Sequence, residues 1–315
     1  MGIGLPETWW IKSFKSATMR LFIQNWNNIA TDLLANLDKF GFKETRDILE
    51  ADKVITWNDV MPDQIFLIEF AHKRKIPVIV LQHGSKGTSK YYPPFNQKVL
   101  VDKICVWGEG MRTRLLEIGT PEAKVEVTGT TIFSHLEPKV KHEGINIIFS
   151  PEHWEKDIPE NRDTATKLKK LKGVNIFTKI LPMHNKWWYD NPILSDRNDP
   201  KHFEIIADLL AKTDLVVGIM EGTFELLAQS LDIPIVIMKD WKPKPIGDDD
   251  RYLKYSKRLS VASKETTLKD LTSTIEQQLK NPDELKEQRR LEAINEGGIN
   301  IENPLGNIMK VIKNA

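Results

Sequence analysis

The fold is decided by the stretch from residue 214 to residue 227, which reads DLVVGIMEGTFELL. Its first part, 215–219, is a continuous apolar run of the kind that forms a strand covered on both faces of a parallel sheet. A Gly222-Thr223 turn follows, and apolar residues then recur at helical spacing over 223–231. A strand that leads through a short turn into a helix is the repeating unit of an α/β fold.

The same alternation extends in both directions along the chain. Before this stretch, the sequence predicts strands at 54–57, 78–81, 104–107, 125–127, 145–149 and 174–180 and helices at 62–75, 111–118 and 203–212. After it, the sequence predicts strands at 235–238 and 259–262 and helices at 268–279, 282–295 and 304–312. The fold class is therefore α/β, with two Rossmann-like parallel-sheet domains that face a cleft.

The first 40 residues do not follow this alternation. Apolar side chains such as Trp10, Leu21 and Leu33 recur at helical spacing, and the pattern ends before Gly41, a common helix terminator. This pattern predicts a long helix, or two, in place of the early strands of a complete domain. Aromatic side chains beside basic ones, as around Lys12, are also typical of a helix at a membrane surface. Core packing and membrane-surface contact both remain open for this helix.

The length of 315 residues exceeds what one hydrophobic core usually fills, so the chain should form two domains of roughly 140 to 170 residues. The stretch 137–144 is polar, contains Pro and Gly, and has no apolar period, which is typical of an interdomain linker. We therefore expect an acceptor-side domain at 1–138, a linker at 139–144 and a nucleotide-donor domain at 145–300. The terminal helix, 301–315, is expected to pack back on the first domain.

Composition excludes several classes of protein. The 45 Lys and Arg nearly balance the 44 Asp and Glu, which disfavours binding to duplex nucleic acid. The single cysteine, Cys105, lies in an apolar run and can form neither a disulfide framework nor a zinc site alone. No stretch approaches the roughly 18 apolar residues of a spanning helix. We expect a cytoplasmic protein, peripheral at the inner membrane face if the first helix contacts lipid; the oligomeric state stays open.

A candidate catalytic base follows the predicted strand 78–81. His83 stands at the carboxyl end of this strand in the sequence Gln82-His83-Gly84-Ser85, where the sheet of an α/β domain binds its ligands. The neighbouring glycines let a backbone approach a ligand closely. An imidazole, with an unperturbed pKa of about 6.5, can take a proton from an acceptor hydroxyl near neutral pH. We predict that Gln82, Gly84 and Ser85 line the same acceptor loop.

Candidate donor-binding residues follow two strands of the second domain. Lys179 is the second-last residue of the predicted strand 174–180, and His184 comes shortly after it; both could counter the charge of a departing phosphate. Each also has a structural alternative, as a solvated strand residue and an ordinary loop residue.

The second group lies in the opening stretch. Gly222 and Thr223 start a helix, whose free N–H groups and positive end attract a phosphate. The carboxylates of Glu221 and Glu225 could accept hydrogen bonds from ribose hydroxyls, or could simply favour the start of the helix.

The sequence offers no convincing metal site. The acidic run Asp248-Asp249-Asp250 resembles the Asp-x-Asp metal motif of other sugar transferases, but it precedes a helical pattern and is more typical of a helix N-cap. The remaining histidines lack the spacing of metal ligands. We therefore expect neither a metal nor another cofactor, only a nucleotide-activated donor as substrate.

These segments together resemble the GT-B superfamily, over residues 52 to 315. Within it they resemble the bacterial surface-polysaccharide branch of CDP-glycerol glycerophosphotransferases and capsule synthesis enzymes. The segments that carry the resemblance, in family order, are Gln82-His83-Gly84, 102–109, 124–129, 149–154, Lys179 with His184, and 221–234. The chain departs from the family pattern at Asn185, where a Pro is usual, at Glu221-Gly222, where a Ser pair is usual, and in the position of Glu225.

The resemblance implies a metal-independent transferase that moves a glycosyl or alditol-phosphate group from a nucleotide-activated donor to an acceptor hydroxyl, in surface glycan synthesis. A CDP- or CMP-linked donor is favoured and a UDP-linked donor comes second; the acceptor would be a glycan or a lipid-linked molecule. Segments 102–129 and 297–312 also resemble UDP-N-acetylglucosamine 2-epimerases. Two alternatives therefore stay open: a UDP-sugar 2-epimerase and a non-catalytic GT-B-like binding subunit.

Overall fold

The chain forms two compact units that are each built around one sheet. The computed structural model describes residues 9–10, 19–24, 28–57, 62–82, 84, 100–117, 119–151, 159–180, 189, 191–194, 202–219, 222–238 and 260–315. Unit 1 comprises residues 1–132 and 295–315, and unit 2 comprises residues 133–294. The chain therefore passes between the units twice, after Ile132 and after Ile294.

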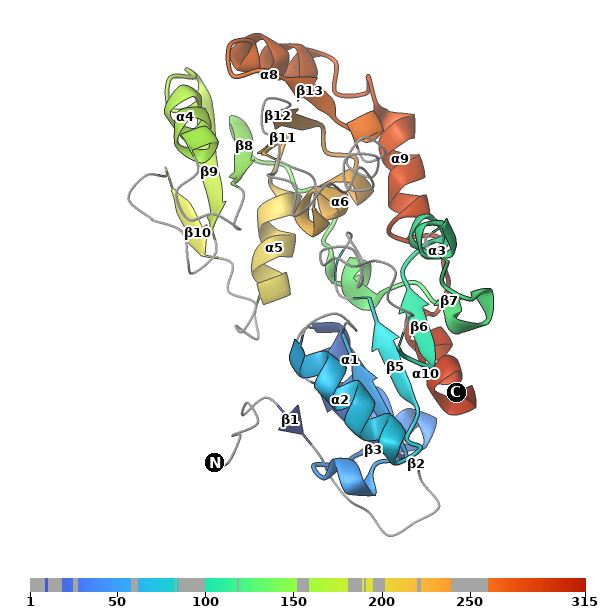
Figure 1. Ribbon diagram of the computed structural model, residues 1–315. Helices are drawn as coiled ribbons and strands as arrows, with labels where there is room; N and C mark the ends of the chain where they lie inside the picture. The colour runs from blue at the N-terminus through green and yellow to red at the C-terminus, as the bar shows by residue number, and fades with distance from the viewer. Residues whose placement is uncertain are drawn as a thin grey trace. The chain divides into compact units, whose positions relative to one another are not determined.

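Unit 1 contains a sheet of seven strands among the described residues (Figure 1). Their spatial order is β1-β2-β4-β5-β6-β7, with β3 paired to β2, and every pairing except that of β1 is parallel. The strands are β1 (Trp9–Trp10), β2 (Met19–Gln24), β3 (Phe42–Glu44), β4 (Lys53–Thr56), β5 (Val78–Leu81), β6 (Lys103–Val106) and β7 (Val125–Val127). The helices are α1 (Asn28–Asn36), α2 (Pro62–Lys73), α3 (Glu109–Glu117) and α10 (Pro304–Asn314).

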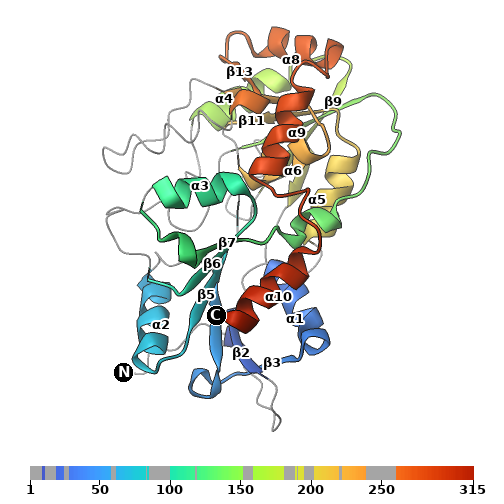
Figure 2. The same cartoon turned by 90° about the vertical axis from the view of Figure 1, so that its right-hand side faces the viewer.

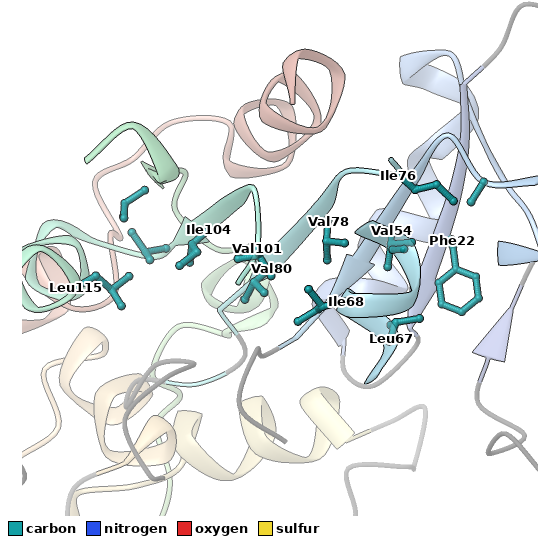
Figure 3. Close-up of a cluster of buried hydrophobic side chains, with 14 of the residues drawn as sticks. Phe22, Val54, Leu67, Ile68, Ile76, Val78, Val80, Val101, Ile104 and Leu115 are labelled. Carbon is teal, nitrogen blue, oxygen red and sulfur yellow. The ribbon is translucent and has the colours of Figure 1, made fainter. Parts of the chain in front are cut away.

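The core of unit 1 lies between this sheet and helices α2 and α3. Figure 3 shows buried side chains from successive strands, among them Phe22, Val54, Val78 and Ile104, in one continuous cluster. Strands β4 and β5 are buried at every position, because a parallel sheet is covered on both faces. Burial of the strands holds their carboxyl ends in place, and the candidate residues of unit 1 directly follow the end of β5.

The C-terminal helix α10 completes unit 1 and contacts β6 (Figure 2). Asn303 begins the helix: its side chain accepts a hydrogen bond from the Gly306 N–H at 3.2 Å, and Pro304 occupies the first helical position. The Asn307 side chain donates to the Thr128 carbonyl at 3.3 Å, just after β7. The last residues of the chain are thus tied to a sheet formed by its first residues.

Unit 2 contains a sheet of six strands among the described residues, all parallel, in the order β10-β9-β8-β11-β12-β13. The strands are β8 (Ile145–Ser150), β9 (Val174–Ile180), β10 (Pro192–Leu194), β11 (Leu215–Gly218), β12 (Ile235–Met238) and β13 (Lys264–Thr266). The helices are α4 (Pro159–Leu168), α5 (His202–Ala211), α6 (Thr223–Ser230), α8 (Leu271–Lys280) and α9 (Lys286–Asn295). Two parallel sheets with their helices in one chain confirm the predicted α/β class with two Rossmann-like domains.

The predicted helix over residues 8–40 is wrong across its middle part. Residues Met19–Gln24 form the strand β2, which pairs with β4, and a helix begins only at Asn28. Unit 1 therefore does have an early strand. Leu21, Phe22 and Ile23 are buried in the sheet. A short, continuous apolar run fits a buried strand and a helix equally well, and periodicity could not separate them.

The predicted last strand of unit 2 is also misplaced. Residues Ser260–Ala262 form a single 3-10 turn, and the strand β13 follows at Lys264–Thr266, parallel to β12. The apolar residues on which the strand was predicted therefore precede β13, and one of them, Ala262, is fully buried.

No helix in the part of the chain that the structure describes is long and apolar enough to span a bilayer.

Candidate functional site

In unit 2, the turn between β11 and α6 holds described candidate residues. Gly222 is the N-cap of α6 and has an extended backbone conformation. Its N–H donates to the Glu225 carboxylate at 2.8 Å, and Glu225 is 3% exposed. The carboxylate thus satisfies an N-terminal amide of its own helix and faces the positive end of the helix dipole. The structure gives Glu225 a capping role; its predicted contact to a ribose stays a prediction.

Lys179 lies next to the same helix start. It occupies the second-last position of β9, and its ammonium nitrogen is 5.1 Å from the centroid of the Phe224 ring. Phe224 is the second residue of α6 and is buried. Strands β9 and β11 both flank β8, so their carboxyl ends meet at one edge of the sheet. The structure therefore places the Lys179 ammonium against the ring of Phe224, in the first turn of α6.

In unit 1, the candidate loop begins with a buried, fully engaged side chain. Gln82 is 1% exposed and directly follows β5. Its side-chain oxygen accepts from the Trp107 N–H at 2.8 Å, and its side-chain nitrogen donates to the Gly84 carbonyl at 2.8 Å. The Trp107 indole N–H donates to the Gln82 carbonyl at 2.8 Å. Gln82 therefore holds the residues on both sides of position 83 to the carboxyl end of β6.

The segment that re-enters unit 1 packs closely against Trp107 and the start of α3. A Cβ added at Gly108 would overlap the Asn295 carbonyl oxygen, and one added at Gly298 would overlap the Trp107 carbonyl oxygen. Two stretches of backbone thus approach each other through glycines. Sequence reasoning missed Trp107 as part of this site, because it placed Trp107 inside the strand 104–107, whereas β6 ends at Val106.

A buried ion pair joins the same two segments. The Arg114 guanidinium on α3 makes two hydrogen bonds to the Glu296 carboxylate, one of them at 2.5 Å, and the two side chains are 11% and 6% exposed. A Cβ added at Gly110 would overlap the Glu296 carboxylate, so the first turn of α3 is packed on it. The two partners are 182 positions apart in the sequence, so no local sequence pattern could predict their contact.

The single cysteine, Cys105, is free and buried. It lies in β6 and is 2% exposed, and burial raises the pKa of its thiol, so that it stays protonated near neutral pH. Its environment is that of a small buried apolar residue.

Several predicted residues lie outside the described residues. They are His83, Ser85, His184, Glu221 and the acidic run at 248–250. The described residues contain no group of three or more His, Cys, Asp or Glu side chains that could hold a metal ion. The parts of the candidate site that the structure describes are therefore Gln82 and Gly84 in unit 1, and the α6 start with Lys179 in unit 2.

Comparison with known proteins gives a likeness of fold. No family model matches the chain, and no curated protein matches its sequence. Among solved structures, a protein described as a UDP-N-acetylglucosamine 2-epimerase from Listeria monocytogenes is 14% identical, with a TM-score of 0.63 over 95% of this chain and 96% of that one. A UDP-GlcNAc 2-epimerase from Neisseria meningitidis, bound to UDP-GlcNAc, is 17% identical, with a TM-score of 0.53 over 91% of this chain and 79% of that one.

A third structure belongs to another class of enzyme. The wall teichoic acid polymerase TagF, as a variant soaked with CDP-glycerol, is 12% identical, with a TM-score of 0.56 over 94% of this chain and 88% of that one. At sequence identities this low, the comparison shows a likeness of fold and nothing about the activity of this chain. The two parallel sheets with their helices match the two Rossmann-like domains of these neighbours. The chain therefore has the GT-B fold.

Proposed function

We propose that the protein is a metal-independent transferase that moves a glycosyl or alditol-phosphate group from a nucleotide-activated donor to an acceptor hydroxyl in surface glycan synthesis. The observation that carries the proposal is the position of Lys179 beside the first turn of α6. An ammonium group and a helix N-terminus both attract anions, and together they suit the phosphates of a nucleotide. Neighbours of the same fold that bind UDP-GlcNAc or CDP-glycerol support this class of ligand.

The proposed reaction needs a general base for the acceptor and groups that stabilise the leaving nucleotide. The acceptor oxygen forms the new bond to the sugar carbon or to phosphorus, and His83 takes the acceptor proton. The bond to the nucleotide phosphate oxygen breaks, and its electron pair leaves with the nucleotide. Lys179, with His184 and the Gly222-Thr223 turn, would stabilise the charge that develops on this leaving group.

The nucleotide of the donor can be identified by thermal stabilisation. Of CMP, CDP, UDP and GDP, one is expected to stabilise the protein, and a cytidine nucleotide should have the largest effect, with UDP second. A ligand at 100 times its dissociation constant contributes about 2.7 kcal/mol to the free energy of unfolding. For a chain of this size the melting temperature should rise by a few degrees, which differential scanning fluorimetry resolves.

A matched pair of variants locates this binding. Thr223→Trp places an indole at the start of α6 and should abolish the nucleotide-dependent shift. Ser273→Trp introduces the same indole on the exposed surface of α8 and should leave the shift intact. If millimolar concentrations of all the nucleotides fail to stabilise the wild type, the donor site assigned to unit 2 is wrong.

The proposed mechanism does not involve a metal, and this can be tested separately. Turnover should survive EDTA, and Asp249→Asn should keep activity near that of the wild type, since this run is predicted to cap a helix. Turnover is measured as release of CMP from CDP-glycerol, or of UDP from UDP-N-acetylglucosamine if the nucleotide panel selects UDP. Loss of activity with EDTA and recovery with Mn²⁺ or Mg²⁺ would contradict the mechanism.

The epimerase neighbours support a second candidate function, a UDP-sugar 2-epimerase. The two functions differ in their need for an acceptor. Conversion of UDP-N-acetylglucosamine to its 2-epimer with no acceptor present would favour the epimerase. Nucleotide binding without turnover under either condition would favour a non-catalytic binding subunit.

A further inference from the structure

We propose that the outer face of α2 binds the surface of an anionic lipid bilayer. This face carries two aromatic side chains, Phe66 and Phe70, and three cations at the end of the helix and in the turn after it, Lys73, Arg74 and Lys75. The proposal goes beyond the transferase function and does not depend on it, because it concerns where unit 1 is held and not which bond is made.

The first step is that α2 already has one apolar side in the core. Leu67, Ile68 and Ala71 are buried, and Figure 3 shows Leu67 and Ile68 within the core cluster of unit 1. A surface helix needs only this one apolar stripe, and its opposite side is ordinarily polar. The opposite side of α2 instead carries Phe66, which is 60% exposed. Packing within unit 1 therefore does not account for this side chain.

The second step is that Phe66 belongs to a stripe. Positions 66, 70 and 74 follow one another at intervals of four, so their side chains lie on one side of the helix. The ring centroids of Phe66 and Phe70 are 6.4 Å apart, and the guanidinium carbon of Arg74 lies 3.7 Å from the centroid of the Phe70 ring. Single exposed apolar residues are normal on protein surfaces. An aromatic pair that continues into a cation is more typical of an interaction surface.

The third step is that the charge of this face selects an anionic partner. Over residues 64–75, Lys73, Arg74 and Lys75 are exposed, and the one exposed carboxylate is that of Glu69. The whole chain has a formal net charge of only +1, so attraction to an anionic surface must come from such a local excess of cations. Aromatic rings beside Lys and Arg are the combination that binds at the interface of an anionic bilayer. The rings enter below the headgroups, and the cations contact the phosphates.

The first test is cosedimentation with vesicles of phosphatidylcholine, either alone or with about 30% phosphatidylglycerol. The wild type should bind the anionic vesicles at least about 10-fold more strongly, and this binding should weaken as the salt concentration rises from about 0.1 M to about 0.5 M. Phe66→Ser should weaken the binding about 10-fold, because the serine buries no apolar surface in the bilayer. Lys73→Gln combined with Arg74→Gln should weaken it by about fivefold for each cation removed.

Two matched controls alter other surfaces. Val261→Ser removes an apolar side chain of unit 2 that is 54% exposed, and Lys310→Gln combined with Lys313→Gln removes two exposed cations from α10. Both controls should bind the anionic vesicles within about twofold of the wild type. All of these variants should keep the wild-type melting temperature, since the altered side chains lie at the surface. Equal binding by Phe66→Ser and Val261→Ser, equal binding of the wild type to both kinds of vesicle, or binding to neither would overturn the proposal.

A fluorescent label measures the contact directly. Cys105 is the only cysteine of the chain and is 2% exposed, so Phe66→Cys supplies the one accessible thiol. A polarity-sensitive fluorophore attached there should brighten and shift to the blue with anionic vesicles, whereas the same label on Val261→Cys should not change. An unshifted label at position 66 on vesicle-bound protein would show that another surface binds the lipid. Neither measurement uses a donor or an acceptor, so its outcome is distinct from that of the proposed transferase reaction.

Discussion

Gly298→Ala should be among the most destabilising single substitutions in the protein, with a loss of about 3 kcal/mol or more in the free energy of unfolding. Gly298 has a φ of +63°, and an L-residue in this left-handed region costs about 1 to 2 kcal/mol. The added Cβ would also overlap the backbone carbonyl of Trp107, and such overpacking costs about 1 to 3 kcal/mol. Urea denaturation followed by circular dichroism measures the loss.

Two further glycines separate these contributions. Gly41 has a φ of +76° with nothing within 4 Å of an added Cβ, so Gly41→Ala should show the backbone cost alone. Gly108→Ala adds a Cβ that overlaps the Asn295 carbonyl and carries no positive φ, so it should show the steric cost alone. Gly298→Ala should exceed both. Equal stability of the Gly298 and Gly41 variants would show that the returning segment is not closely packed on Trp107.

Most strands could be placed from the sequence because of how parallel sheets are buried. The strands Val78–Leu81, Val125–Val127, Val174–Ile180 and Ile235–Met238 have the bounds that the apolar runs predict. Each apolar run is short and is followed by polar or turn residues, so the sequence defines where the strand ends. The sequence did not predict the strand β2, because its short, buried apolar run stood within a longer pattern of helical spacing.

The candidate site could be predicted only where position along a strand decides it. Lys179 was selected because it stands near the end of a strand, and Gly222 because it starts a helix; in the structure Gly222 is the N-cap of α6, and the Lys179 ammonium lies 5.1 Å from the ring of Phe224 in that helix. The partners of Gln82 could not be found in this way, since Trp107 is 25 positions away. Glu296 is further still from Arg114. The contact between Gln82 and Trp107 depends on the pairing of β5 with β6, and the Arg114–Glu296 pair depends on the return of the C-terminal segment to unit 1. No local sequence pattern predicts either.

His83→Ala should lower turnover by a factor of about 100 or more while leaving donor affinity nearly unchanged. Loss of a general base typically costs this much, because the acceptor hydroxyl must then lose its proton to water. The donor phosphates are assigned to unit 2, so nucleotide stabilisation in the fluorimetry panel should persist. The wild type should lose activity as the pH falls through the imidazole range near about 6.5, and the variant should lack this limb.

His72→Ala is the matched control for His83→Ala. His72 lies in the last turn of α2 in the same unit, and its ring lies 3.0 Å from the Asp102 carboxylate, which also accepts from the Val78 N–H at the amino end of β5. It therefore sits at the edge of the sheet opposite to that of Gln82, and its loss should leave turnover within about twofold of the wild type. Equal loss of donor binding in His83→Ala would move His83 from base to donor ligand. Near-normal turnover would remove it from the chemistry, and with it the reason to expect that unit 1 supplies the proton acceptor.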